Sequence, residues 1–183
     1  MISGALVWPA WLAVFLVTAL VQARARTGLW HTLGVLALTT YAFWIASAAF
    51  FPIPTEGDPG FLIGAVNLVP FRDLVNSFAH LSAGQIVRQH GGNLLLLAPF
   101  TLVGPALWPR IQAWKWALAT GVGASAAIEL LQLGLSALVG YNYRSADIDD
   151  VILNTAGALL GYAVFLGTRR VTRALRRRAS APA

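Results

Sequence analysis

The chain has 183 residues, of which 57% are hydrophobic and 11% are charged, and its formal net charge is +6. Soluble domains carry about 25% charged residues, so this composition argues against an ordinary soluble domain and indicates a membrane protein. The sequence contains no cysteine, which excludes disulfides and thiolate chemistry. Its basic residues flank apolar stretches, so they indicate membrane topology rather than nucleic-acid binding.

Five apolar segments approach the roughly 20 residues needed to cross a bilayer. They predict an all-α polytopic membrane protein with helices at about residues 2–21, 32–51, 92–108, 113–139 and 148–167. Between the second and third helices, an apolar patch at 61–71 is either re-entrant or lies on the membrane surface. Residues 72–90 then repeat apolar side chains at near-helical spacing (Leu74, Val75, Phe78, Leu81, Ile86). This pattern predicts an amphipathic helix that either lies in the interface plane or packs on the bundle.

Arginine and lysine predict the orientation of the chain, because they are enriched in cytoplasmic loops. Residues 169–178 contain six arginines, so we expect the C-terminus inside the cell and the N-terminus outside. Residues 1–170 then form a single transmembrane domain, and residues 171–183 form a basic cytoplasmic tail. In this orientation, six of the seven acidic residues lie in outer loops, and Glu129 lies within the fourth helix.

Glu129 is energetically unfavourable within a membrane helix, because placing a charge at the bilayer centre costs at least about 2.5–3.5 kcal/mol. Gln132 follows three residues later and shares its helix face. Glu129 is therefore either a functional residue or a protonated or paired glutamate that holds helices together. Asn93 stands at the start of the third predicted helix, where it can act as a cap. Pro99 predicts a kink in that helix, and kinked membrane helices often border cavities.

The stretch "RSADIDD", residues 144–150, places one arginine and three aspartates at the start of the fifth helix. Asp147 can cap this helix, with Asp150 as the reciprocal acid. Capping does not explain three clustered carboxylates, which repel one another. Their positive partner is Arg144, a divalent cation such as Mg²⁺ or Ca²⁺ held by Asp147, Asp149 and Asp150, or a substrate ammonium group.

Helical spacing aligns Asp147, Asp150 and Asn154 on one stripe, which small residues continue at Gly157, Ala158 and Gly161. The small residues predict close helix packing. In the expected orientation, all of the polar residues within the spans lie near the outer face, and Arg72, His80 and His90 could reach the same level from the outer segment. The sequence therefore predicts one polar cavity open to the outside, built from a larger set of residues: Asn93, Glu129, Gln132, Arg144, Asp147, Asp149, Asp150 and Asn154.

Four blocks carry a family resemblance: "NLVPF" (67–71), "GGNLLLLAPF" (91–100), "IELLQ" (128–132) and "RSADIDDVILNTAGALLGY" (144–162). With them the chain resembles the VanZ-like family of bacterial membrane proteins over a motif core at 67–162. The chain departs from the family pattern after the second block, where "APFTLVG" replaces the common Pro-Leu-Gly. The resemblance implies a multi-pass protein of the bacterial cytoplasmic membrane, in a family whose named member is associated with teicoplanin resistance. It also adds Asn67 to the candidate site residues.

The expected function is binding or modification of a membrane lipid or lipid-linked cell-envelope precursor at its headgroup. Arg144, together with Arg72, would hold a phosphate or carboxylate. Glu129, Asp147, Asp149 and Asp150 would act as acid/base groups or as metal ligands. No Ser–His pair lies near the last block, which disfavours a named hydrolysis and leaves open whether there is a reaction. The alternatives are a proton-coupled transporter with Glu129 as relay, and a non-enzymatic scaffold protein held together by the polar cluster.

Overall fold

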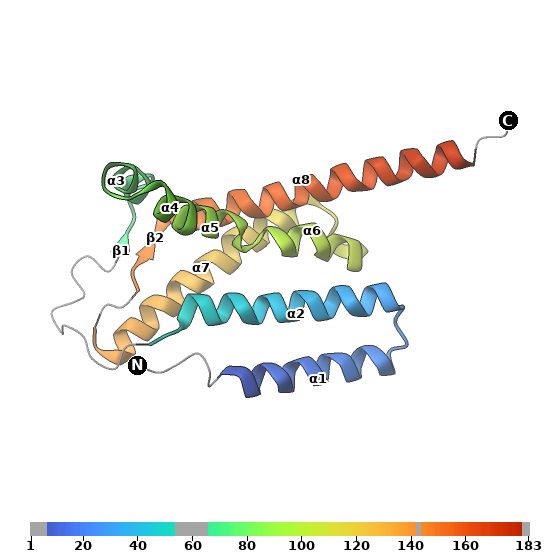
Figure 1. Ribbon diagram of the computed structural model, residues 1–183, viewed down its shortest axis with the longest axis horizontal. Helices are drawn as coiled ribbons and strands as arrows, with labels where there is room; N and C mark the ends of the chain where they lie inside the picture. The colour runs from blue at the N-terminus through green and yellow to red at the C-terminus, as the bar shows by residue number, and fades with distance from the viewer. Residues whose placement is uncertain (1–6, 54–65, 142–143, 181–183) are drawn as a thin grey trace.

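A computed structural model describes residues 7–53, 66–141 and 144–180. The fold is helical, apart from two short parallel strands, β1 (Val66–Asn67) and β2 (Ala146–Asp147). Figure 1 shows both strands at the end of the bundle where the last helix begins. The helices are α1 (Trp8–Arg24), α2 (Leu29–Phe50), α3 (Arg72–His80), α4 (Ala83–Ile86), the π-helix η2 (Val87–Gly91), α5 (Gly92–Leu96), α6 (Ala98–Leu107), the 3₁₀-helix η3 (Pro109–Ile111), α7 (Trp114–Val139) and α8 (Ile148–Ala179).

Four helical stretches in the described residues are long and apolar enough to cross a membrane, which confirms the predicted all-α membrane fold. They are Leu29–Phe50, Ala83–Leu107, Trp114–Val139 and Ile148–Ala179. The first predicted span corresponds to α1, an apolar helix of 17 residues that is shorter than the other four. The beginning of that predicted span, residues 2–6, lies outside the described residues.

Helix α8 is the centre of the bundle and packs against α5, α6 and α7. Figure 1 shows α8 running alongside α5 and α6, with α7 crossing beneath them and the α1–α2 hairpin below. Glycines make the close packing on α8 possible, because a Cβ at Gly157 would overlap the backbone carbonyl of Leu94, and one at Gly161 would overlap that of Ala98. The small-residue stripe predicted from the sequence is thus the surface of α8 that contacts α5 and α6.

The third span begins earlier than predicted, at Ala83 rather than at residue 92. Ser82 and Gln85 form a capping box that starts the helix, which then passes through the π-helical turn η2. The prediction that Asn93 caps this helix is therefore wrong, because the residues before it are already helical. The chain breaks instead at Leu97, between α5 and α6.

The break at Leu97 confirms the kink predicted from Pro99, which lies in the first turn of α6. A proline within a helix removes one backbone donor and leaves the carbonyl four residues earlier without its helical partner. That carbonyl belongs to Leu95, and it accepts a hydrogen bond of 3.2 Å from the hydroxyl of Tyr41 in α2. The carbonyl that the kink leaves free therefore links the third span to α2 through this hydrogen bond.

The last span is longer than predicted, because α8 does not end near residue 167 but continues to Ala179. The added turns contain the arginine-rich segment, and arginine has a high helix propensity. Figure 1 shows this end of α8 extending beyond the other helices. The basic segment is thus a helical continuation of the last span through Ala179.

Helix α3 exposes its apolar side instead of packing it on the bundle. Phe71, Val75 and Phe78 share one face at helical spacing and are 54–67% exposed, whereas Ser77 on the other side is buried. The single amphipathic helix predicted over residues 72–90 is divided, because α3 ends at His80 and a new helix starts after Ser82. Of the two predicted placements of this amphipathic segment, the exposed apolar face favours the membrane interface.

Because the chain has no cysteine, single spin labels can measure where α3 lies. Labels at Val75→Cys and Phe78→Cys are expected to show high collision with oxygen and low collision with a water-soluble nickel chelate, in liposome-reconstituted protein. The control Asn76→Cys lies on the exposed polar side and is expected to show the opposite ratio. High nickel accessibility at all three positions would place α3 in water and contradict the interfacial assignment.

Candidate functional site

The connection between α7 and α8 is held by polar groups of α7. Glu129 is buried, and its Oε2 accepts a hydrogen bond of 2.9 Å from the backbone N–H of Asp147. Seven residues further along α7, the Ser136 hydroxyl donates to the carbonyl of Arg144 at 2.9 Å. These contacts fix Arg144 and the first residues of α8 against α7.

Asp147 and Asp149 have structural partners at the start of α8. Asp147 caps the helix as predicted, because its carboxylate accepts the backbone N–H of Asp149 at 2.8 Å. It also accepts two hydrogen bonds, of 3.0 and 3.1 Å, from the side-chain amide of Asn67 in β1. Asp150 is not the reciprocal acid predicted for this cap, since the backbone N–H of Asp147 donates to Glu129 instead.

Asp149 caps α3 from a distant part of the chain. Its carboxylate, 2% exposed, accepts the backbone N–H groups of Phe71 and Leu74, the latter at 3.0 Å. Phe71 has a left-handed backbone conformation, with φ of 65°, which turns the chain into α3 at this point. The side chain of Asp149 therefore attaches the outer segment to the end of α8.

Asp73 and His90 lie beside these aspartates. The Asp73 carboxylate accepts a hydrogen bond of 3.0 Å from the side-chain amide of Gln89. Partial burial raises the pKa of Asp73, and the negative charges of Asp147 and Asp149 act in the same direction, whereas His90 and the Gln89 bond oppose it. His90 is buried, and neither of its ring nitrogens has a hydrogen-bond partner.

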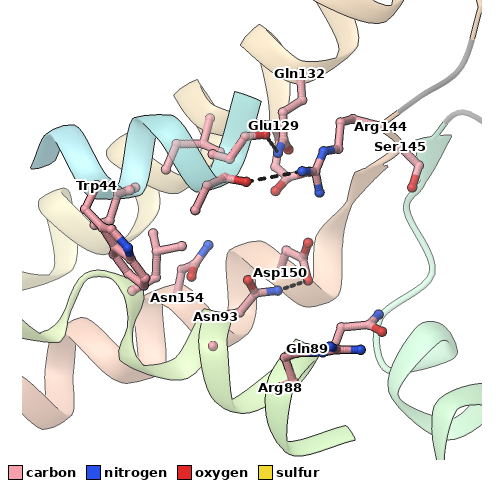
Figure 2. Close-up of a pocket in the computed structure, with 16 residues that line it drawn as sticks. Trp44, Arg88, Gln89, Asn93, Glu129, Gln132, Arg144, Ser145, Asp150 and Asn154 are labelled. Carbon is pink, nitrogen blue, oxygen red and sulfur yellow. Dashed lines mark hydrogen bonds between the residues drawn. The ribbon is translucent and has the colours of Figure 1, made fainter. Parts of the chain in front are cut away.

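A cavity of about 760 Å³ lies between α2, the η2–α5 stretch, α7 and the start of α8. Figure 2 shows polar side chains converging on it from these elements. Six of the ten site residues predicted from the sequence line it: Asn93, Glu129, Gln132, Arg144, Asp150 and Asn154. The other four lie outside its lining, and they are Asn67, Asp147, Asp149 and Arg72, of which the last is exposed on α3.

Hydrogen bonds orient the polar groups of the cavity. The amide of Asn93 donates to Asp150, and the amide of Gln132 donates to the carbonyl of Ala49 at 2.9 Å. The guanidinium of Arg144 donates to the carbonyl of Ala48 at 3.2 Å. Both carbonyl acceptors belong to the last turns of α2, so the end of this helix forms one wall of the cavity.

Charges of both signs line the cavity without pairing. Arg88 and Arg144 supply the positive charge, and Glu129 and Asp150 supply the negative charge. Within the part of the chain that the structure describes, no ion pair joins either arginine to a carboxylate. The interpretation of Arg144 as the direct ion-pair partner of the aspartates thus finds no support in the geometry.

The predicted divalent-cation site does not fit the arrangement of the aspartates. Among residues 7–53, 66–141 and 144–180, no group of three or more histidine, aspartate or glutamate side chains is placed to hold a metal ion. Asp147 and Asp149 direct their oxygens at N–H donors, which a metal would have to displace.

Arg88 and Trp44 line the cavity but were absent from the predicted site. A signal for Arg88 was present in the charge distribution. Of the 13 basic residues, only Arg72, Arg88 and Arg144 fall outside the segments expected to be cytoplasmic, and two of these three line the cavity. Basic residues that depart from the topology rule are thus candidates for ligand contacts.

Comparison with known proteins agrees with the motif blocks. A family model described as VanZ/LLP1 matches residues 35–170, which include the predicted motif core. The chain therefore belongs to the VanZ/LLP1 family. None of the curated proteins and none of the solved structures matches the chain.

Proposed function

We propose that this VanZ/LLP1-family membrane protein binds the phosphate-bearing headgroup of an envelope lipid, or of a lipid-linked envelope precursor, in the cavity beside α8. The observation that carries the proposal is that Arg88 and Arg144 line the same cavity, where neither forms an ion pair with a described residue. A guanidinium group binds phosphate oxygens through two parallel N–H donors. The cavity volume of about 760 Å³ is within the range typical of small-molecule sites.

The position of the cavity supports a headgroup as the ligand. It lies where α2 ends and α8 begins, so it is at the end of two membrane-spanning helices, and lipid headgroups occupy that level. In the expected orientation this end faces the outside of the bacterial cytoplasmic membrane. Binding of a cell-wall precursor there would also give a physical route to teicoplanin resistance, the phenotype associated with the family's named member.

The proposal is tested by replacing the two arginines. Each of Arg88→Gln and Arg144→Gln is expected to weaken binding of a short-chain phospholipid about tenfold or more, because each removes charge-assisted hydrogen bonds to phosphate. The measurement is microscale thermophoresis with dihexanoyl phosphatidylglycerol and dihexanoyl phosphatidylethanolamine. The matched control is Arg72→Gln, an exposed arginine outside the lining, which is expected to leave the affinity unchanged. Equal losses for all three variants would indicate attraction by surface charge and contradict a binding site in the cavity.

The two alternative functions receive less support from the geometry. Below the cavity, α7 and α8 are closely packed, since a Cβ at Gly121 would come within 2.8 Å of the Cα of Thr155. This contact leaves little room for a path between the two helices, as a transporter would need. The scaffold alternative describes Asp147 and Asp149, which join elements of the fold, but it does not explain a cavity lined by charges of both signs.

A further inference from the structure

One buried oxygen beside the cavity has no hydrogen-bond donor. Asn154 is 2% exposed, and its amide nitrogen donates to the hydroxyl of Ser125 at 2.8 Å. Its Oδ1 atom has no partner, although Asn154 lines the cavity. A buried acceptor without a donor is energetically unfavourable, so this oxygen points to a ligand that carries a hydrogen-bond donor.

The two carboxylates of the cavity have acceptor capacity to spare as well. One oxygen of Glu129 accepts from the backbone of Asp147, and one oxygen of Asp150 accepts from Asn93. No donor from the described residues reaches the second oxygen of either group. Glu129 and Asp150 place two carboxylates on the same cavity, so these groups favour a ligand that is positively charged.

We propose that Glu129, Asp150 and Asn154 bind a primary ammonium group, so that the preferred headgroup is zwitterionic. This inference rests on the proposed function, in which Arg88 and Arg144 bind the phosphate of the same headgroup. A primary ammonium carries three N–H donors and no acceptor, which matches three acceptor oxygens on three residues. Its charge offsets that of the carboxylates, just as the phosphate offsets the arginines.

Figure 2 shows Glu129 next to Arg144, and Asp150 between Arg144 and Arg88, so groups of opposite charge alternate around the cavity. In this view Asn154 lies on the opposite side of the cavity from Arg144, and Trp44 lies beside Asn154. An aromatic face attracts cations, including alkylammonium groups. A neutral glycerol headgroup lacks the positive charge, and a choline headgroup has the charge but no N–H donor, so both should bind less well than an ethanolamine headgroup.

The first experiment uses the unmodified protein in detergent and three dihexanoyl phospholipids with the same acyl chains. Phosphatidylethanolamine is expected to bind at least about tenfold more tightly than phosphatidylglycerol or phosphatidylcholine, as measured by thermophoresis. Equal affinity for the ethanolamine and glycerol lipids, or for the ethanolamine and choline lipids, would overturn the ammonium assignment. This comparison needs no variant and is independent of any folding defect.

The second experiment assigns the preference to the carboxylates. In Glu129→Gln/Asp150→Asn, the ratio of the two dissociation constants, glycerol lipid over ethanolamine lipid, is expected to fall to about one. The matched control is Asp73→Asn, which makes the same chemical change outside the cavity lining and should keep the preference. A preference that survives in Glu129→Gln, in Asp150→Asn and in the double variant would also overturn the assignment.

The outcomes separate this inference from the proposed function. If no phospholipid binds, or if the arginine variants lose no affinity, the proposed function fails. If the arginine variants lose affinity but the three lipids bind equally, only the ammonium assignment fails. O-phosphoethanolamine and glycerol phosphate, which lack acyl chains, separate a lipid from a soluble phosphate ester. If O-phosphoethanolamine binds as tightly as phosphatidylethanolamine, the ligand is a soluble phosphate ester and the lipid assignment is overturned. The ammonium preference is then measured as the ratio of the dissociation constants of glycerol phosphate and O-phosphoethanolamine.

Discussion

Asp149→Asn is expected to destabilise the protein by about 3 kcal/mol or more, and to release α3 from the end of α8. The buried carboxylate accepts the backbone N–H groups of Phe71 and Leu74, and hydrogen bonds to charged groups contribute about 1.5–3 kcal/mol each. Asparagine has a single acceptor oxygen, so its amide group would face one of the two N–H donors. In a chain of this size, the loss corresponds to a decrease of roughly 6–12 °C in Tm, measured by thermal unfolding in detergent.

This variant separates a structural role from a chemical one. The matched control is Asp73→Asn, since Asp73 is a neighbouring, partly exposed acid with one side-chain partner, and its loss should cost less than about 1 kcal/mol. A spin label at Phe78→Cys should also become more mobile when Asp149→Asn is added. If Asp149→Asn instead keeps the wild-type Tm and loses ligand binding, the residue belongs to the site itself, as the sequence alone suggested.

The membrane spans were predictable because hydropathy is a local property of the sequence. Three of the four long apolar stretches coincide with the single helices α2, α7 and α8, and the stretch Ala83–Leu107 consists of α4, η2, α5 and α6 in succession. The ends of the helices were less predictable. Asn93 has good capping chemistry, but the helix passes through it, because the capping box at Ser82 starts the helix earlier. Likewise, arginines that mark the cytoplasmic side also continue α8 to Ala179.

Most residues of the site were predictable, but the sequence did not show which of them line the cavity and which hold the fold together. Glu129, Asp150 and Asn154 were found because polar residues are costly inside membrane helices, and they line the cavity. Asp147 and Asp149 belong to the same motif, yet their partners lie 75–80 residues away in sequence. A sequence pattern cannot show that the oxygens of a carboxylate already accept hydrogen bonds from N–H groups of a distant segment.

The proposed zwitterionic ligand also bears on a question that the sequence left open, namely which positive group is the partner of the clustered aspartates. Clustered aspartates required a positive partner, and the candidates were an arginine, a metal ion or a substrate ammonium group. The structure accounts for Asp147 and Asp149 through N–H donors, and Asp150 remains beside Glu129 in the cavity. The carboxylates that still need a positive partner are therefore Asp150 and Glu129, and both line the cavity, where a ligand can bind.

Gly157→Ala is expected to cost about 3 kcal/mol and to disturb the cavity, although Gly157 does not line it. The added Cβ would overlap the backbone carbonyl of Leu94, and a backbone atom cannot move aside as a side chain can. Overpacking of this kind costs about 1–3 kcal/mol, and occasionally more. To relieve the overlap, α5 must shift away from α8, which would pull Asn93 away from Asp150.

The control for this prediction is Gly167→Ala in the same helix, where an added Cβ has no neighbour within 4 Å. This substitution should leave Tm unchanged or raise it, because alanine favours helix by about 1 kcal/mol over glycine. Thermal unfolding and phospholipid affinity are measured for both variants. Gly157→Ala should lose both stability and affinity, since the same helix contact positions Asn93. A variant that loses stability but binds with wild-type affinity would show that the cavity does not depend on the close approach of α5 and α8.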